Sequence, residues 1–336
     1  DEGNIVEHDI RKYLVHRERK SLGLRFDYNL GNTELYTDLN YNDRDDYENR
    51  YRQRIKDLDE GEGSQEVRRQ TKAGLPGNEY GRLEDQKLFS YKFGGTSLLD
   101  KLKLDYSFKI SEASELRPNE RYLALRLKKQ TAVWNQSTEK PNFTFTNAIA
   151  ADLNNSWDFR NLIEERRDTD EKAQSFKVDA DYNFNDNLKL EAGLKISSRK
   201  KERRNEFYEF EPVDEDAFLA DAFSNIVSQD KSEWLNDGDG TSYNSGSYVS
   251  REFLGNLDLS NTELFERVIV EEELAGNFKA SEDITSFYGM ASYDYSDQLL
   301  VVGGIRLERT FLYDLEARSY DEAVSYTHLT LPTTYE

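Results

Sequence analysis

Alternation of apolar and polar residues, repeated in four separate places, is the feature that most constrains the fold of this chain. The clearest case runs from Phe176 to Phe184, turns at Asn185-Asp186-Asn187, and returns from Leu188 to Ile196. Successive side chains of a β-strand point to opposite faces, so this pattern predicts a hairpin with one apolar and one polar face. The other predicted strand pairs are 22–30 with 35–41, 89–93 with 102–110, and 287–295 with 299–307. In the second pair we expect the turn at Gly94-Gly95-Thr96.

Long polar segments join these four hairpins. They run from about Asn42 to Asp85, Ser111 to Lys172 and Ser197 to Asp283, whereas ordinary connections have about 4–6 residues. Tight turns on one edge and long charged connections on the other are typical of outer-membrane barrels, and a soluble sandwich has no reason for this asymmetry. The predicted fold is therefore all-β: a partial antiparallel transmembrane β-barrel of outer-membrane type, with about eight strands in four hairpins and long extracellular loops.

Aromatic residues gather where a strand enters each tight turn. Amphipathic rings prefer the headgroup level of a membrane, so rings at one height indicate an aromatic girdle. The alternative is that Tyr and Phe are simply good strand residues. The rings concerned are Phe26, Tyr28, Tyr91, Phe93, Tyr182, Phe184, Tyr293 and Tyr295.

Composition excludes several classes of function. The 66 acidic residues outnumber the 45 basic ones, which argues against nucleic acid as a partner, since phosphate binding needs a basic surface. The chain has no Cys and three His, and it contains no phosphate-binding glycine loop or Ser/His/Asp arrangement. Asp237 to Gly240 matches only a fragment of a calcium loop. We therefore expect no enzyme activity, no cofactor and no metal site.

The segment from Tyr288 to Thr310, YGMASYDYSDQLLVVGGIRLERT, resembles a hairpin of TonB-dependent outer-membrane receptors. Residues 24–46 and 178–195 are similar in style. The resemblance implies a place in the Gram-negative outer membrane, in contact with its lipid, and uptake of a nutrient such as a siderophore or a glycan. It also implies an N-terminal plug domain inside a barrel of about 22 strands, through which the TonB complex acts as partner.

The chain departs from this family pattern because it contains no recognisable plug or TonB-binding segment. We therefore expect residues 1–324 to be an internal part of a receptor barrel, with the plug domain absent from this chain. Residues 325–336, SYTHLTLPTTYE, continue no upstream pattern and are expected to be a non-native tail. Two alternatives stay open: a soluble secreted β-sandwich or adhesin that binds carbohydrate, and a small complete barrel without a transport role.

Aromatic residues of the long segments are the candidate ligand contacts, because exposed rings beside carboxylates can hold a sugar, a peptide or a metal chelate. The alternative is that these rings pack the loops onto one another. Residues 212–227 place acids before apolar residues at helical spacing, which predicts a short amphipathic helix packed against neighbouring loops. The candidate ligand contacts are Trp134, Trp157, Trp234, Tyr243 and Tyr248.

Overall fold

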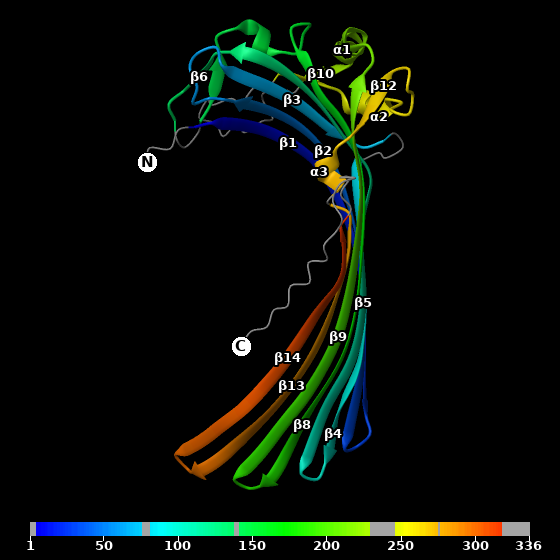
Figure 1. Ribbon diagram of the computed structural model, residues 1–336, viewed down its shortest axis with the longest axis vertical. Helices are drawn as coiled ribbons and strands as arrows, with labels where there is room; N and C mark the ends of the chain where they lie inside the picture. Colours follow the sequence, from blue (N-terminus) through cyan, green and yellow to red (C-terminus); the bar gives the residue numbers. More distant parts are fainter. Residues whose placement is uncertain (1–4, 76–80, 138–140, 229–245, 275, 318–336) are drawn as a thin grey trace.

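The computed structural model describes residues 5–75, 81–137, 141–228, 246–274 and 276–317, and an antiparallel sheet of ten strands dominates it (Figure 1). The strand order is β1-β2-β3-β5-β8-β9-β13-β14, with β4 also between β2 and β5, and β12 beside β9. Within the described part of the chain the sheet is open, with β1 and β14 at its edges. The strands are β1 (Glu7–Asn29), β2 (Thr33–Lys56), β3 (Gln65–Ala73), β4 (Arg82–Leu99), β5 (Leu102–Gln130), β8 (Asp158–Asn185), β9 (Leu188–Pro212), β12 (Phe265–Ile269), β13 (Phe278–Ser296) and β14 (Leu299–Ala317).

Smaller elements gather at one end of the sheet, which we call the loop end; the opposite end, with the tight turns, is the turn end (Figure 1). The loop-end elements lie on the convex side of the curved sheet. They comprise β6 (Ala132–Trp134), β7 (Phe143–Phe145), the 3-10 helix η1 (Ala148–Ala151), α1 (Glu215–Ser224), β10 (Ile226–Ser228), β11 (Ser247–Val249) and α2 (Arg251–Asn256). The short helix α3 (Glu271–Leu274) precedes β13.

The four predicted hairpins are confirmed as β1/β2, β4/β5, β8/β9 and β13/β14. The predicted turn of the second hairpin is wrong, because β4 continues through Gly94 and Gly95 to a turn at residues 100–101. A Cβ atom at Gly94 would lie 2.5 Å from the Tyr36 hydroxyl oxygen, and one at Gly95 would lie 2.8 Å from the Tyr106 hydroxyl oxygen. The two glycines therefore make room within the strand for rings from β2 and β5, and do not bend the chain.

Much of the sequence predicted as long loops is also strand. Five of the strands have 23 to 29 residues, and β2, β5, β8 and β9 extend far into the charged connections. Cross-strand ion pairs replace apolar alternation there, as in Arg204 Nη2 to Asp168 Oδ2 at 2.7 Å. The pattern that reveals strands in the sequence is lost, although backbone pairing continues. The asymmetry itself remains, since the connections at the turn end have only two or three residues.

Two strands share one position between β2 and β5. Lys72 of β3 is the Cα partner of Arg50, and Arg82 of β4 is the Cα partner of Glu48. The chain therefore leaves the sheet after β3 and re-enters it at β4 almost at the same level. This brings Lys72 and Arg82, which are ten positions apart in the chain, close together on the sheet.

The main core lies between the convex face of the sheet and the loop-end elements. The predicted helix is confirmed as α1, which is capped by Asp214 accepting a hydrogen bond from the Ala217 amide at 2.9 Å. The buried face of α1 belongs to the same apolar cluster as residues of β3, β5 and β8. The helix therefore packs against neighbouring segments, as the sequence predicts. This core includes Val67, Leu123, Leu125, Trp157, Leu162, Phe210, Phe218, Leu254 and Phe265.

Candidate functional site

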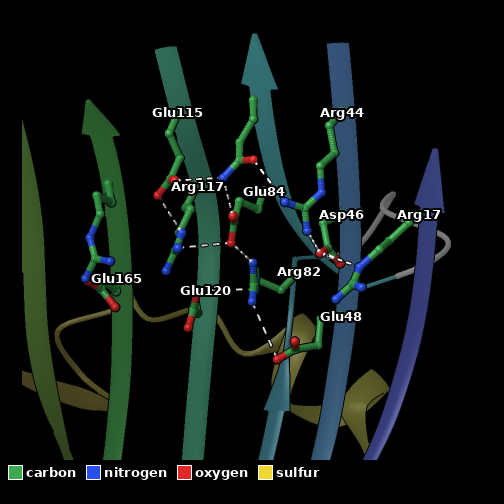
Figure 2. Close-up of polar contacts among 12 residues, drawn as sticks. Arg17, Arg44, Asp46, Glu48, Arg82, Glu84, Glu115, Arg117, Glu120 and Glu165 are labelled. Atoms are coloured by element: carbon green, nitrogen blue, oxygen red, sulfur yellow. Dashed lines mark hydrogen bonds and ion pairs between the residues drawn. The ribbon is translucent and has the colours of Figure 1, made fainter. Parts of the chain in front are cut away.

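A network of ion pairs crosses the concave face of the sheet, opposite the loop-end core (Figure 2). Alternation along each strand places its members on one face, and the strand register brings them into neighbouring rows. We call this set the concave-face ion network. It consists of Arg17 from β1, Arg44, Asp46 and Glu48 from β2, Lys72 from β3, Arg82, Glu84 and Gln86 from β4, and Glu115, Arg117 and Glu120 from β5.

The centre of the network is buried. Glu120 is 2% exposed, and its carboxylate lies 3.1 Å from Lys72 Nζ and 3.3 Å from Arg82 Nε. Glu48 contacts the same two cations at 2.9 and 3.5 Å. Burial alone would lower the pKa of Arg82, but Glu120, Glu48 and Glu84 outweigh it and raise that pKa. The three carboxylates therefore favour the charged form of Arg82.

A β-bulge in β5 makes this centre possible. The register with β8 shifts between Arg117 and Glu120, so that Arg117 is the partner of Arg167 while Glu120 is the partner of Glu165. In a regular strand residues 117 and 120 would point to opposite faces, because they are three positions apart and successive strand residues alternate. The bulge inserts one extra residue, since Pro118 and Asn119 together lie opposite the single residue Arg166. The bulge therefore places both side chains on the concave face.

From this centre the network extends along β5 and across β4 and β2 to β1. Arg117 lies 3.0 Å from carboxylates of both Glu84 and Glu115. Gln86 donates to Glu115 at 2.9 Å and accepts from Arg44 at 3.1 Å. Arg44 contacts Asp46 at 2.7 Å, and Asp46 also receives Arg17 at 2.8 Å. Figure 2 shows this unbroken series of contacts between the strands.

The concave face is hollowed beside the network into a groove of about 540 Å³. Its lining includes Arg19, Arg44 and Lys201 together with Glu115 and Glu171. The groove therefore carries both signs of charge, and its lining also includes the apolar side chains of Leu88 and Ala113.

The candidate ligand-contact rings at Trp157 and Tyr248 pack inside the protein. They are 1% and 0% exposed, and the Arg69 guanidinium lies 4.9 Å and 5.8 Å from their ring centroids. Burial lowers the pKa of Arg69 to about 10, while its nitrogens donate to the carbonyl oxygens of Ser247 and Ala150. At these two positions the structure places loop packing where a ligand contact was expected.

The remaining candidate rings are placed differently. Trp134 is half-buried, stacks on Phe143 with centroids 6.4 Å apart, and donates from Nε1 to the Ser137 carbonyl at 3.1 Å. Trp234 and Tyr243 lie outside the described residues, as does the calcium-loop fragment at residues 237–240. The structure therefore does not bring the five candidate rings together in one described site.

Three carboxylates also approach one another on the convex face, above the apolar strand segments. One oxygen from each of Asp43, Asp45 and Asp85 lies within 4.8 Å of the others. Burial, followed by repulsion from Asp85 and Asp43, raises the pKa of Asp45. Lys87 contacts Asp85 at 2.6 Å and already supplies a positive charge there.

The concave-face ion network was not predicted from the sequence, because most of its residues lie in segments that were predicted to be loops. The usable signal was the period-two series Arg44, Asp46 and Glu48, which continues the polar face of the predicted strand. Comparison of the chain with protein-family models and with curated proteins finds no match. None of the described helices is long and apolar enough to cross a membrane.

Proposed function

We propose that this chain forms part of the wall of a β-barrel in the outer membrane of a Gram-negative bacterium. The barrel would belong to a TonB-dependent receptor that takes up a nutrient such as a siderophore or a glycan. The TonB complex would act on a plug domain that is not part of this chain. The receptor assignment rests on the resemblance of residues 288–310 to that family, and the membrane assignment rests on the surface described next.

An exposed apolar band on the convex face carries the proposal. It covers the turn-end half of all four hairpins, below the loop-end core, and large apolar surfaces of this kind mark contact with lipid or with another protein. Residues 22–30 make eight steps of about 3.4 Å; at a strand tilt of about 40° these span roughly 21 Å, close to the apolar height of about 25 Å of outer-membrane barrels. The band includes Leu22, Leu24, Phe26, Tyr28, Phe93, Phe108, Phe176, Tyr182, Phe184, Leu190, Ile196, Phe287, Tyr293, Tyr295, Leu299, Val301, Ile305 and Leu307.

The rings within this band support a girdle. Phe26, Tyr28 and Tyr295 are 66%, 65% and 70% exposed close to the tight turns. Amphipathic rings at one height match the headgroup level of a membrane. The polar concave face would then line the interior of the barrel, where charged residues remain in contact with water or with a plug.

The open edges of the sheet set a requirement for the proposal. Every backbone group must be hydrogen-bonded in lipid, so β1 and β14 must each pair with a further strand in the complete barrel. The sandwich alternative would instead need a second sheet over the apolar band. The described part of the chain places none there, since the band's side chains are exposed.

Adjacent residues of β9 provide the test. Because the chain has no Cys, Ile196→Cys and Lys195→Cys each create a single site for a spin label, on the convex and concave faces respectively. In lipid vesicles, the label at position 196 should be relaxed mainly by oxygen, which concentrates in lipid. The label at position 195 should be relaxed mainly by a water-soluble nickel chelate.

Two outcomes contradict the membrane proposal. One is equal access of the nickel chelate to both labels in vesicles. The other is a folded, monodisperse monomer in buffer without detergent, which supports the soluble sandwich. The TonB link is tested separately on the complete gene product, which should bind the periplasmic domain of TonB; a complete product without a plug domain contradicts it.

A further inference from the structure

Six arginines gather on the concave face toward the loop end, beyond the concave-face ion network. Arg54, Arg68 and Arg126 are direct Cα partners on the adjacent strands β2, β3 and β5. In the next row Arg11 is the partner of Arg52. We call this set the arginine cluster. It consists of Arg11, Arg50, Arg52, Arg54, Arg68 and Arg126.

The neighbouring carboxylates neutralise only part of this charge. Asp9 accepts two hydrogen bonds from Arg54, both 2.8 Å, and a third from Arg11 Nε at 3.0 Å. Glu66 pairs with Arg68. These carboxylates form ion pairs with Arg11, Arg54 and Arg68, but with neither Arg52 nor Arg126.

Arg52 and Arg126 are half-buried cations without a carboxylate partner among the described residues. The Nε atom of each is buried and has no hydrogen-bond partner. Burial, reinforced by repulsion from Arg54 and Arg50, lowers the pKa of Arg52 to about 10. An unpaired polar group that is shielded from water costs free energy, so this arrangement destabilises the chain unless something else binds there.

The contrast with the ion network makes the unbalanced charge informative. Lys72, the Cα partner of Arg50, contacts both Glu48 and Glu120, so the same strands supply carboxylates to a neighbouring cation. Like charges directly opposite one another on a sheet are destabilising. The ion network also contains like-charged neighbours, but there each cation lies within 4 Å of a carboxylate, which Arg52 and Arg126 lack among the described residues. A local excess of one charge beside a region where the charges are paired is typical of a binding site.

We propose that the arginine cluster binds a multiply charged oxyanion, carrying carboxylate or phosphate groups, on its way into the barrel interior. This inference rests on the proposed function, because it assigns the substrate class of that receptor. Guanidinium groups bind carboxylate and phosphate oxygens in pairs of parallel hydrogen bonds. Strands lie about 4.8 Å apart, so Arg54 and Arg126 place cations roughly 10 Å apart on either side of Arg68. The site therefore fits a ligand with several anionic groups better than a single small anion.

Two tyrosines shape the inner edge of the cluster. The Arg50 guanidinium lies 5.9 Å from the ring centroid of Tyr13 and 5.8 Å from that of Tyr122. Arg50 also donates to the Gln70 side chain at 2.5 Å. These contacts hold Arg50 in a defined position, which lowers the entropy cost of binding an anion there.

Calorimetric titration of the folded chain in detergent tests the proposal, with tripolyphosphate as the phosphate probe and citrate as the carboxylate probe. The double variant Arg52→Gln/Arg126→Gln should weaken binding at least tenfold. The matched control is Arg25→Gln/Arg306→Gln, which removes two cations from the same face. Arg25 pairs with Asp27 at 2.8 Å, and Arg306 pairs with Glu308 at 2.6 Å. Because both cations already have a carboxylate partner, the control should change the affinity for either probe less than twofold.

The folded state of the double variant is checked by urea unfolding. Because it removes unpaired like charges, it should be at least as resistant to urea as the parent chain. Arg52→Lys/Arg126→Lys keeps the charge but loses the two-pronged geometry, so it should bind with intermediate affinity.

Three results would overturn the proposal: no binding of either probe by the parent chain, equal weakening in the double variant and its control, or undiminished binding by the double variant. The spin labels at positions 195 and 196 report independently on the membrane location. Failure of anion binding with the expected label pattern therefore rejects only the substrate class, and the reverse combination rejects only the membrane proposal.

Discussion

Replacing Glu120 by Gln removes the carboxylate that lies between Lys72 and Arg82 at 3.1 and 3.3 Å. Removing one partner of a buried ion pair costs about 3–5 kcal/mol. Both cations keep another carboxylate, since Lys72 contacts Glu48 at 2.9 Å and Arg82 contacts Glu84 at 2.8 Å. We therefore expect the lower end of that range, about 3 kcal/mol of lost unfolding free energy.

The matched control is Glu112→Gln on the same strand. Glu112 pairs with Lys172 at 3.1 Å, but the two side chains are 60% and 70% exposed, and such surface pairs contribute about 0–1 kcal/mol. The measurement is urea unfolding in lipid vesicles, followed by tryptophan fluorescence, to which buried Trp157 contributes. A loss for Glu120→Gln that is no larger than the loss for Glu112→Gln would refute the view that the buried centre stabilises the sheet.

Three further predictions follow from other contacts. Gly193→Val should lower the urea midpoint, at a cost of about 1–3 kcal/mol, because a Cβ there collides with a tyrosine ring on β13; Gly303→Val, where nothing lies within 4 Å, should not. Burial alone would raise the pKa of Asp9, but hydrogen bonds from Arg54 and Arg11 outweigh it and lower that pKa. The stabilisation is therefore complete above about pH 4 and is lost as the pH falls through the folded-state value, so Asp9→Asn should flatten the pH dependence of unfolding below about pH 4. Asp214→Ala should cost about 1 kcal/mol by removing the cap of α1, measured by the same urea unfolding.

The sequence pattern was reliable only where one strand face is apolar. Residues 176–196 predict β8/β9 and its turn correctly, because alternation and Asn/Asp turn residues coincide there. The turn at Gly94-Gly95-Thr96 was wrong, since glycine serves both to turn a chain and to accommodate a neighbouring ring. That second use depends on Tyr36 and Tyr106, which lie on other strands.

The long charged connections show the same limit. Residues 42–56 look like a loop in the sequence, yet they continue β2 as a strand. Their backbone pairs with β1, β3 and β4, and their charges are balanced by partners on those strands. A local pattern does not contain that information, because the partners are distant in the chain.

The sequence by itself determined that this chain forms antiparallel hairpins with one apolar and one polar face, and that tight turns lie at one end. It did so because side-chain alternation and turn chemistry are local properties of the chain. Only the tertiary structure decided how far the strands extend, which rings are buried, and where charge is balanced or left unbalanced. Those features depend on the register between strands, including the bulge between Arg117 and Glu120. That register places Glu120 between two cations and Arg126 beside Arg68, which no local pattern reveals.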